Sequence, residues 1–294
     1  MGQIWFEVTC VTLFVTFFVM ADAPSKRRLV ASGNRFARDY RLWIAPAEVE
    51  AVNRAHRADY RVGVAALTVG VVAYAVARLF ADALTVSWAS ISVVTGVAAA
   101  LRVRQAGRDF TPPPETLAVA RSRTVRLRDY LSATGLVVLG AGPVLALGAA
   151  VIGADAVRRD VGDIERAWFV FGAGSAGLAL GLLLPVFSVA IIPRPLPASD
   201  AAHLYLQDAW RVERLRQMVQ FQSMALAFLL SYAHGLLPVA DSVSLWLLPL
   251  TFTPIIAIVV THAGRLHFRR RLWPDLTRDE WVEVGGAMPA AAAR

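Results

Sequence analysis

Long apolar runs separated by short charged segments dominate this chain. A helix that crosses a bilayer needs about 20 mostly apolar residues. Runs near this length cover residues 4–20, 62–80, 84–101, 130–153, 168–192, 221–237 and 243–262. They lack the alternation of apolar and polar residues that barrel strands require, and a backbone in lipid must satisfy its own hydrogen bonds. The pattern therefore predicts an all-α, polytopic transmembrane helical bundle of about seven spans.

The distribution of charge gives these spans a direction. With the N-terminus outside, the inner segments are roughly 21–61, 102–129, 193–220 and 263–294, and they hold 26 of the 30 Lys and Arg residues. The outer side holds Arg78, Arg158, Arg159 and Arg166. Cytoplasmic loops of membrane proteins are rich in Lys and Arg. We therefore expect an outer N-terminus, an inner C-terminus and a place in the cytoplasmic (inner) membrane of a bacterium.

Composition agrees with a membrane protein, since 56% of the 294 residues are hydrophobic and only 18% are charged. The predicted organisation has four parts. They are a first transmembrane helix (1–22), a basic cytoplasmic segment (23–61), a transmembrane bundle of three helical hairpins (62–271) and a cytoplasmic tail (272–294). The first apolar run is either a retained anchor or a cleaved signal. Basic residues follow this run and none precedes it, which favours the anchor.

The bundle repeats one plan, in which a basic lead-in segment precedes an outward span, a short turn and a returning span. Asp59-Tyr60 and Asp129-Tyr130 each begin an outward span. Asp suits a helix N-terminus and Tyr suits the headgroup layer, so these preferences alone could produce the similarity. True internal repetition, with one anchor helix and three hairpins, is the alternative.

The lead-in segments at 48–61, 115–129 and 200–220 are expected to be helical, because Pro46 and Asp200 suit helix starts. The third is either a helix that binds a partner or lipid, or a cytoplasmic extension of the sixth span. No helix breaker precedes Phe221, which favours the extension.

The tail contains a helix-start signal of its own. Thr277 and Glu280 fit a capping box ahead of Trp281 and Val282. This spacing predicts a short interfacial helix in the tail.

Small residues at helical spacing identify predicted packing faces. Ala173, Gly177 and Gly181 recur every four residues in the fifth span, and Ala149 and Gly153 do so in the fourth. Small side chains allow helices to approach closely within a membrane. We expect both sets to face neighbouring helices.

Polar residues within spans are few. Ser231, Tyr232 and His234 lie toward the outer end of the sixth span and, with Arg78, are candidates for a polar cavity. The five histidines show no metal-ligand spacing and the single cysteine excludes a cysteine-cluster metal site, so no cofactor or metal is expected.

Two arginine clusters lie close to predicted span ends, where anionic headgroups or a partner would contact them. They comprise Arg121, Arg123, Arg126 and Arg128 before the fourth span, and Arg269, Arg270 and Arg271 after the seventh. Aromatic residues that could stack on bases are not interleaved with them, so nucleic acid is not an expected partner.

The sequence contains no nucleophile elbow, phosphate loop or paired intramembrane carboxylates. An enzyme is therefore not expected. The favoured hypothesis is a non-enzymatic accessory, scaffold or regulatory membrane component that acts through a partner on the cytoplasmic side. The alternative is a small-molecule transporter or permease subunit for apolar or amphipathic cargo, since Pro143 and Pro185 would kink helices around a cavity.

Overall fold

The computed structural model describes residues 26–77, 124–160, 164–192, 198, 200–234, 236, 259, 263–277 and 279–284. Within these ranges the chain is mostly helical, in agreement with the expected class. The predicted spans at 4–20 and 84–101, and nearly all of the one at 243–262, lie outside the described residues.

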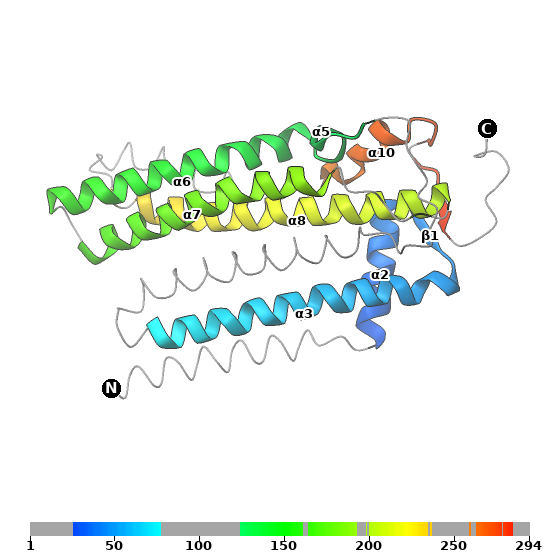
Figure 1. Ribbon diagram of the computed structural model, residues 1–294, viewed down its shortest axis with the longest axis horizontal. Helices are drawn as coiled ribbons and strands as arrows, with labels where there is room; N and C mark the ends of the chain where they lie inside the picture. Colours follow the sequence, from blue (N-terminus) through cyan, green and yellow to red (C-terminus); the bar gives the residue numbers. More distant parts are fainter. Residues whose placement is uncertain are drawn as a thin grey trace.

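Four long helices dominate the described structure. They are α3 (Pro46–Ala77), α6 (Ala133–Arg159), α7 (Ile164–Ile191) and α8 (Ala201–His234). Helices α6, α7 and α8 pack side by side (Figure 1). Both α3 and α8 continue unbroken from a charged lead-in into an apolar run, which confirms that the third lead-in is an extension of the same helix.

Local signals explain where these helices begin. The Ser132 side chain accepts a hydrogen bond from the Gly135 backbone N at 3.4 Å, so Ser132 is the N-cap of α6. The Asp200 carboxylate accepts a hydrogen bond from the His203 backbone N at 2.8 Å and caps α8 in the same way. Pro46 is the first residue of α3, where its missing N–H costs no hydrogen bond.

Two of the described helices are long and apolar enough to cross a membrane. They are α6, with a mean hydropathy of 2.2, and residues 166–186 of α7, with a mean hydropathy of 1.9. Only about a third of each window is buried, so most of its apolar side chains face outward. This outward apolar face distinguishes the pair from the core helix of a soluble protein.

Shorter elements gather around the first half of α8. They are α2 (Lys26–Tyr40), β1 (Leu42–Ile44), α5 (Leu127–Tyr130), η1 (Gly264–Leu266), α10 (His267–Leu272) and β2 (Val282–Val284). Figure 1 places them at one end of the molecule, opposite the far ends of α6 and α7. Strand β1 pairs with β2 in parallel, with Leu42 opposite Val282 and Ile44 opposite Val284.

The expectation of a helix after Thr277 is wrong. The Thr277 backbone N does donate to the Glu280 carboxylate at 3.1 Å, but this contact closes a turn, and the chain then enters β2. Val282 and Val284 are buried while Glu283 between them is exposed. This alternation has the period of a strand, and β-branched side chains favour one. Pairing with β1 therefore prevails over the local capping signal.

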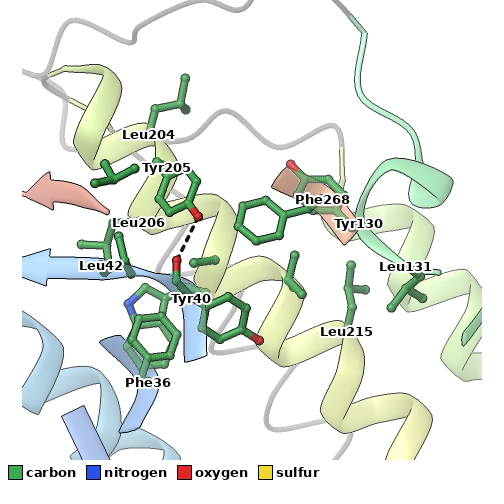
Figure 2. Close-up of a cluster of buried hydrophobic side chains, with 14 of the residues drawn as sticks. Phe36, Tyr40, Leu42, Tyr130, Leu131, Leu204, Tyr205, Leu206, Leu215 and Phe268 are labelled. Carbon is green, nitrogen blue, oxygen red and sulfur yellow. Dashed lines mark hydrogen bonds between the residues drawn. The ribbon is translucent and has the colours of Figure 1, made fainter. Parts of the chain in front are cut away.

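We call α2, β1, α5, residues 201–219 of α8, α10 and β2 the aromatic module, because its core is rich in aromatic rings. Phe36 stacks on Trp210 with ring centroids 4.2 Å apart, and Tyr205 lies 5.3 Å from Phe268. Figure 2 shows side chains from α2, α5, α8 and α10 converging on this core. Elements far apart in the sequence thus share one buried cluster.

A second apolar cluster holds α6, α7 and α8 together. It contains small and branched residues such as Ala146, Ala149, Val170 and Leu229. The two clusters meet along α8, which passes through both.

Candidate functional site

Asp208, Tyr130 and Arg211 form a buried hub at the centre of the aromatic module. The Tyr130 hydroxyl donates to the Asp208 carboxylate at 3.0 Å and accepts from Arg211 Nη1 at 2.9 Å. Trp273 Nε1 also donates to Asp208, at 2.9 Å. Arg211 Nη1 reaches the carbonyl of Ile192 at 3.1 Å, where α7 ends. A cation at a helix C-terminus is favourable, so the hub fixes the end of α7 against α8.

Tyr130, a residue type that suits the headgroup layer, is buried inside the protein and does not face outward. The residue is 1% exposed, and the Arg211 guanidinium lies 5.4 Å from its ring centroid. The physical reason is the short helix α5, which turns Tyr130 toward α8 before α6 begins.

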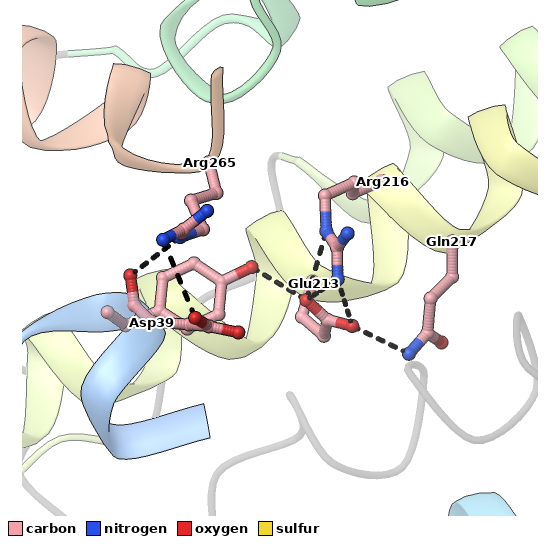
Figure 3. A network of polar contacts seen from close by, with 6 residues as sticks. Asp39, Glu213, Arg216, Gln217 and Arg265 are labelled. Atoms are coloured by element: carbon pink, nitrogen blue, oxygen red, sulfur yellow. Dashed lines mark hydrogen bonds and ion pairs between the residues drawn. The ribbon is translucent and has the colours of Figure 1, made fainter. Parts of the chain in front are cut away.

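A second network joins α2 to α8 (Figure 3). The Tyr40 hydroxyl donates to Glu213 Oε2 at 2.7 Å. Arg216 Nη2 donates to Glu213 at 2.7–2.8 Å and Gln217 Nε2 does so at 2.9 Å. Arg265 adds a further link to α2 through the carbonyl of Asp39 at 3.3 Å.

Burial and charge set the protonation states of this second network. Burial raises the pKa of Tyr40 above its ordinary value, and the neighbouring Glu213 carboxylate raises it further. Burial alone would raise the pKa of Glu213, but the Arg216 charge and the hydrogen bonds from Arg216, Tyr40 and Gln217 outweigh it and lower the pKa. At neutral pH Glu213 is therefore ionised and Tyr40 neutral, so the network is a fixed ion pair with hydrogen-bond support.

Tyr205 connects the two networks. Its hydroxyl donates to the backbone carbonyl of Tyr40 at 2.9 Å. Burial raises the pKa of Tyr205 to about 12, although the nearby Arg269 charge opposes the shift. The hydroxyl is thus a permanent donor at physiological pH.

A small basic cavity lies between the start of α6 and the η1–α10 segment. Its volume is about 240 Å³, and Ser132, Gly264, His267, Arg269 and Arg270 line it. A Cβ on Gly264 would lie 3.1 Å from the Ser132 side chain, so the close approach of these two segments requires glycine.

A larger groove lies beside β1. Its volume is about 550 Å³, and Trp43, Ile44, Val49 and Trp281 give it apolar walls. Trp43 is 65% exposed and its ring centroid lies 6.2 Å from that of Trp281. Arg38 also lines the groove.

The predicted packing residues lie as follows. A Cβ on Gly177 would contact the Ala146 side chain at 3.4 Å, and one on Gly181 would lie 3.0 Å from the Pro143 backbone N. Ala149 is 1% exposed, and Ala173 packs against the same cluster. Gly153 lies against α7, where an added Cβ would come within 2.8 Å of the Phe171 Cα.

The other predicted residues are spread along the molecule. Ser231, Tyr232 and His234 belong to the last turns of α8, whereas Arg78, Arg121 and Arg123 lie outside the described residues. Arg126 and Arg128 are exposed beside α5. Arg269 is buried, while Arg270 and Arg271 are exposed on α10. Among the described arginines of the two clusters, Arg269 and Arg270 line a common cavity.

Sequence reasoning missed Asp208, Arg211 and Tyr130 as partners. Asp208 and Arg211 stand three residues apart on one helix, which brings them to the same face. Trp210, between them in sequence, is also buried, so the first half of α8 is surrounded on several sides.

No cluster of three or more His, Cys, Asp or Glu side chains suited to a metal occurs in the part of the chain that the structure describes. No protein-family model, curated protein or solved structure matches the chain.

Proposed function

We propose that this protein is a non-enzymatic integral membrane component that presents the aromatic module to a partner protein in the bacterial cytoplasm. In this proposal α6 and α7 cross the inner membrane, and the apolar halves of α3 and α8 are two of the further spans in a bundle of about seven. The N-terminus is outside and the C-terminus inside. The partition of 26 of the 30 basic residues supports this orientation.

The outward faces of α6 and α7 support the membrane crossing. Val137, Val144 and Val151 recur every seven residues on α6 and are 66%, 68% and 58% exposed. On α7, Leu182 and Val186 are similarly exposed. An apolar stripe of this length in water would be an aggregation hazard, whereas lipid covers it without cost.

The groove beside β1 is the observation that carries the partner proposal. Trp43 is 65% exposed and Trp281 is 38% exposed, which is unusual for tryptophan on a free surface. Aromatic residues are enriched where proteins bind one another. Arg38 lines the groove, and the Arg41 guanidinium lies 5.6 Å from the Trp281 ring centroid. Between residues 26 and 61 there are nine Lys or Arg and four Asp or Glu. The occupant we propose is a segment of a partner protein that carries apolar side chains flanked by carboxylates.

Two features support the choice of a binding role over the alternatives. The hydrogen-bonded networks hold fixed charges and neutral hydroxyls at neutral pH, which suits a rigid binding platform. The interface of α6 with α7 is a backbone-to-backbone contact at Gly153 and Gly174, so a transport pathway between these two helices is disfavoured.

A photo-cross-linking residue in place of Trp43 tests the proposal in living cells. We expect a discrete protein adduct from position 43 and none from Asp275, an exposed position in the turn after α10 that does not line the groove. Arg38→Glu should remove the adduct, while Arg35→Glu, one turn away on α2, should leave it. Adducts with lipid or with a second copy of this chain, or equal loss in both charge reversals, would refute an acidic partner.

A further inference from the structure

The basic cavity at the start of α6 has the form of an anion site. Its volume of about 240 Å³ is below the range of about 300–1,000 Å³ that is usual for drug-sized ligands, so it suits a single small group. Three of its lining side chains, His267, Arg269 and Arg270, can carry positive charge. The lining residues include no carboxylate to neutralise them.

Arg269 points to a missing ligand. The residue is 3% exposed and lines the cavity, and its Nη2 donates to the Glu280 carbonyl at 2.6 Å. Its Nε and Nη1 have no hydrogen-bond partner among the described residues. A buried guanidinium with open donors is costly unless a hydrogen-bonding anion accompanies it. Tyr205 contributes its aromatic face, with the ring centroid 5.8 Å from Arg269 Cζ, and its hydroxyl also interacts with the guanidinium, but neither supplies the negative charge of an anion.

The N-terminus of α6 opens onto the same cavity. Ser132 caps this 27-residue helix by accepting from Gly135, so its hydroxyl proton remains available to a ligand oxygen. The positive end of the helix dipole lies beside Ser132 and favours an anion there. His267 is held in place through Nε2, which donates to the Arg128 carbonyl at 3.1 Å.

From these observations we infer that the cavity binds the phosphate of a phosphate-bearing anion. A phosphate suits this lining better than a carboxylate, because it carries more negative charge and more acceptor oxygens for the guanidinium and the hydroxyl beside the positive end of the helix. The group can come from an anionic lipid headgroup or from free phosphate. If α6 crosses the membrane as proposed, the cavity lies where the helix enters the bilayer, and the lipid is then the expected source. Phosphate binding itself does not depend on the partner groove.

Three probes of the delipidated, full-length protein in detergent separate the sources. They are dihexanoyl phosphatidic acid, dihexanoyl phosphatidylcholine and inorganic phosphate. Each probe is titrated into the protein, and native mass spectrometry measures how much is bound. We expect saturable one-to-one binding of phosphatidic acid and much weaker binding of the choline lipid. Inorganic phosphate that binds as tightly as phosphatidic acid would support the phosphate site and overturn the lipid source. No saturable binding of any probe would overturn the inference.

Variants locate the binding within the cavity. Arg270→Gln removes a charged donor that lines it, and we expect phosphatidic acid to bind roughly tenfold more weakly. Arg271→Gln makes the same charge change one residue away and should leave affinity unchanged. Gly264→Val, which fills the space beside Ser132, should remove binding even if Arg269→Gln fails to fold. Equal weakening by Arg270→Gln and Arg271→Gln would show diffuse surface attraction and contradict a cavity site.

Discussion

The two ends of this molecule are built on opposite packing rules. Helices α6 and α7 meet through glycine and alanine, and a Cβ on Gly174 would lie 2.5 Å from the Ala150 backbone N. The aromatic module packs through Tyr, Trp and Phe and buries two arginines of α8, Arg211 and Arg214, each 2% exposed. In the proposed topology α6 and α7 lie in lipid, where there is no hydrophobic force between helices, so close backbone contact must hold them together. In water large rings supply burial, and buried charges need partners.

The comparison teaches where each region tolerates change. The α6–α7 contact has no space for added atoms, but it contains few buried polar groups that need hydrogen-bond partners. The aromatic module has polar groups that must remain bonded, and it leaves space at its two cavities. We therefore expect the first region to be sensitive to added volume and the second to lost hydrogen bonds.

The largest expected effect is from added volume at the α6–α7 contact. Gly174→Leu should cost more than about 3 kcal/mol and lower the yield of folded protein, because the new side chain meets the α6 backbone, which cannot move aside. Gly172→Leu is the matched control, since nothing lies within 4 Å of a Cβ there. Thermal unfolding in detergent measures both. Equal behaviour of the two variants would show that α6 and α7 do not pack as described.

Alanine substitutions at three glycines of α7 test the same contact in graded steps. Alanine at Gly174, Gly181 and Gly177 would place its Cβ 2.5, 3.0 and 3.4 Å from its nearest neighbour, respectively. Double Leu substitution at Gly177 and Gly181 should also lower thermal stability, mainly through Gly181. An order of losses other than Gly174, Gly181, Gly177 would contradict this contact geometry.

Next in size is the loss of charge at Glu213. Glu213→Gln removes the negative charge that pairs with Arg216, and the pair is 12–15% exposed, so we expect a loss of about 3 kcal/mol. Glu283→Gln, at an exposed position on β2, is the control and should change little. Denaturant unfolding of the purified protein measures the difference. A neutral Glu213→Gln would mean that the network between α2 and α8 is not formed.

The acid sensitivity of this network follows from the direction of the pKa shift. The folded pKa of Glu213 is below its ordinary value of 4.5, so its stabilising contribution is complete above about pH 4.5 and disappears as pH falls through the folded value. Tyr40→Phe removes the hydroxyl donor and should cost about 2 kcal/mol at pH 7. The cost should shrink as pH falls through the folded pKa of Glu213, because protonated Glu213 accepts that bond more weakly. A cost independent of pH would contradict the assignment.

The smallest expected effect on stability is at the groove. Trp43→Ala removes a ring that is 65% exposed, and we expect a change within about 0.5 kcal/mol. The Trp210 ring stacks on Phe36 in the core, so Trp210→Ala should lower the free energy of unfolding several times more. Large destabilisation by Trp43→Ala would identify Trp43 as a structural residue and remove the main support for a partner.

The sequence was a better guide to the apolar region than to the module. Apolar runs and the spacing of Gly177 and Gly181 indicate α6 and α7 directly, because both signals are local. Gly153, where an added Cβ would lie 2.4 Å from the Phe171 backbone N, was predicted as a packing residue, whereas the similarly close contact at Gly174 was missed, because helix rotation about its own axis depends on the neighbouring helix. In the module, Tyr40 bonds Glu213 across 173 residues. Such pairings leave no local trace, and Arg211 and Arg214 look like solvated charges until the elements around α8 are known.

The most direct test of the account is the accessibility of the two regions from opposite sides of the membrane. In a background with Cys10→Ser, Arg158→Cys marks the exposed end of α6, and Glu283→Cys marks the exposed face of β2. A membrane-impermeant maleimide applied to intact cells should label position 158 at once and position 283 only after permeabilisation. Labelling of position 283 in intact cells would place the aromatic module outside the cytoplasm and contradict the proposed function.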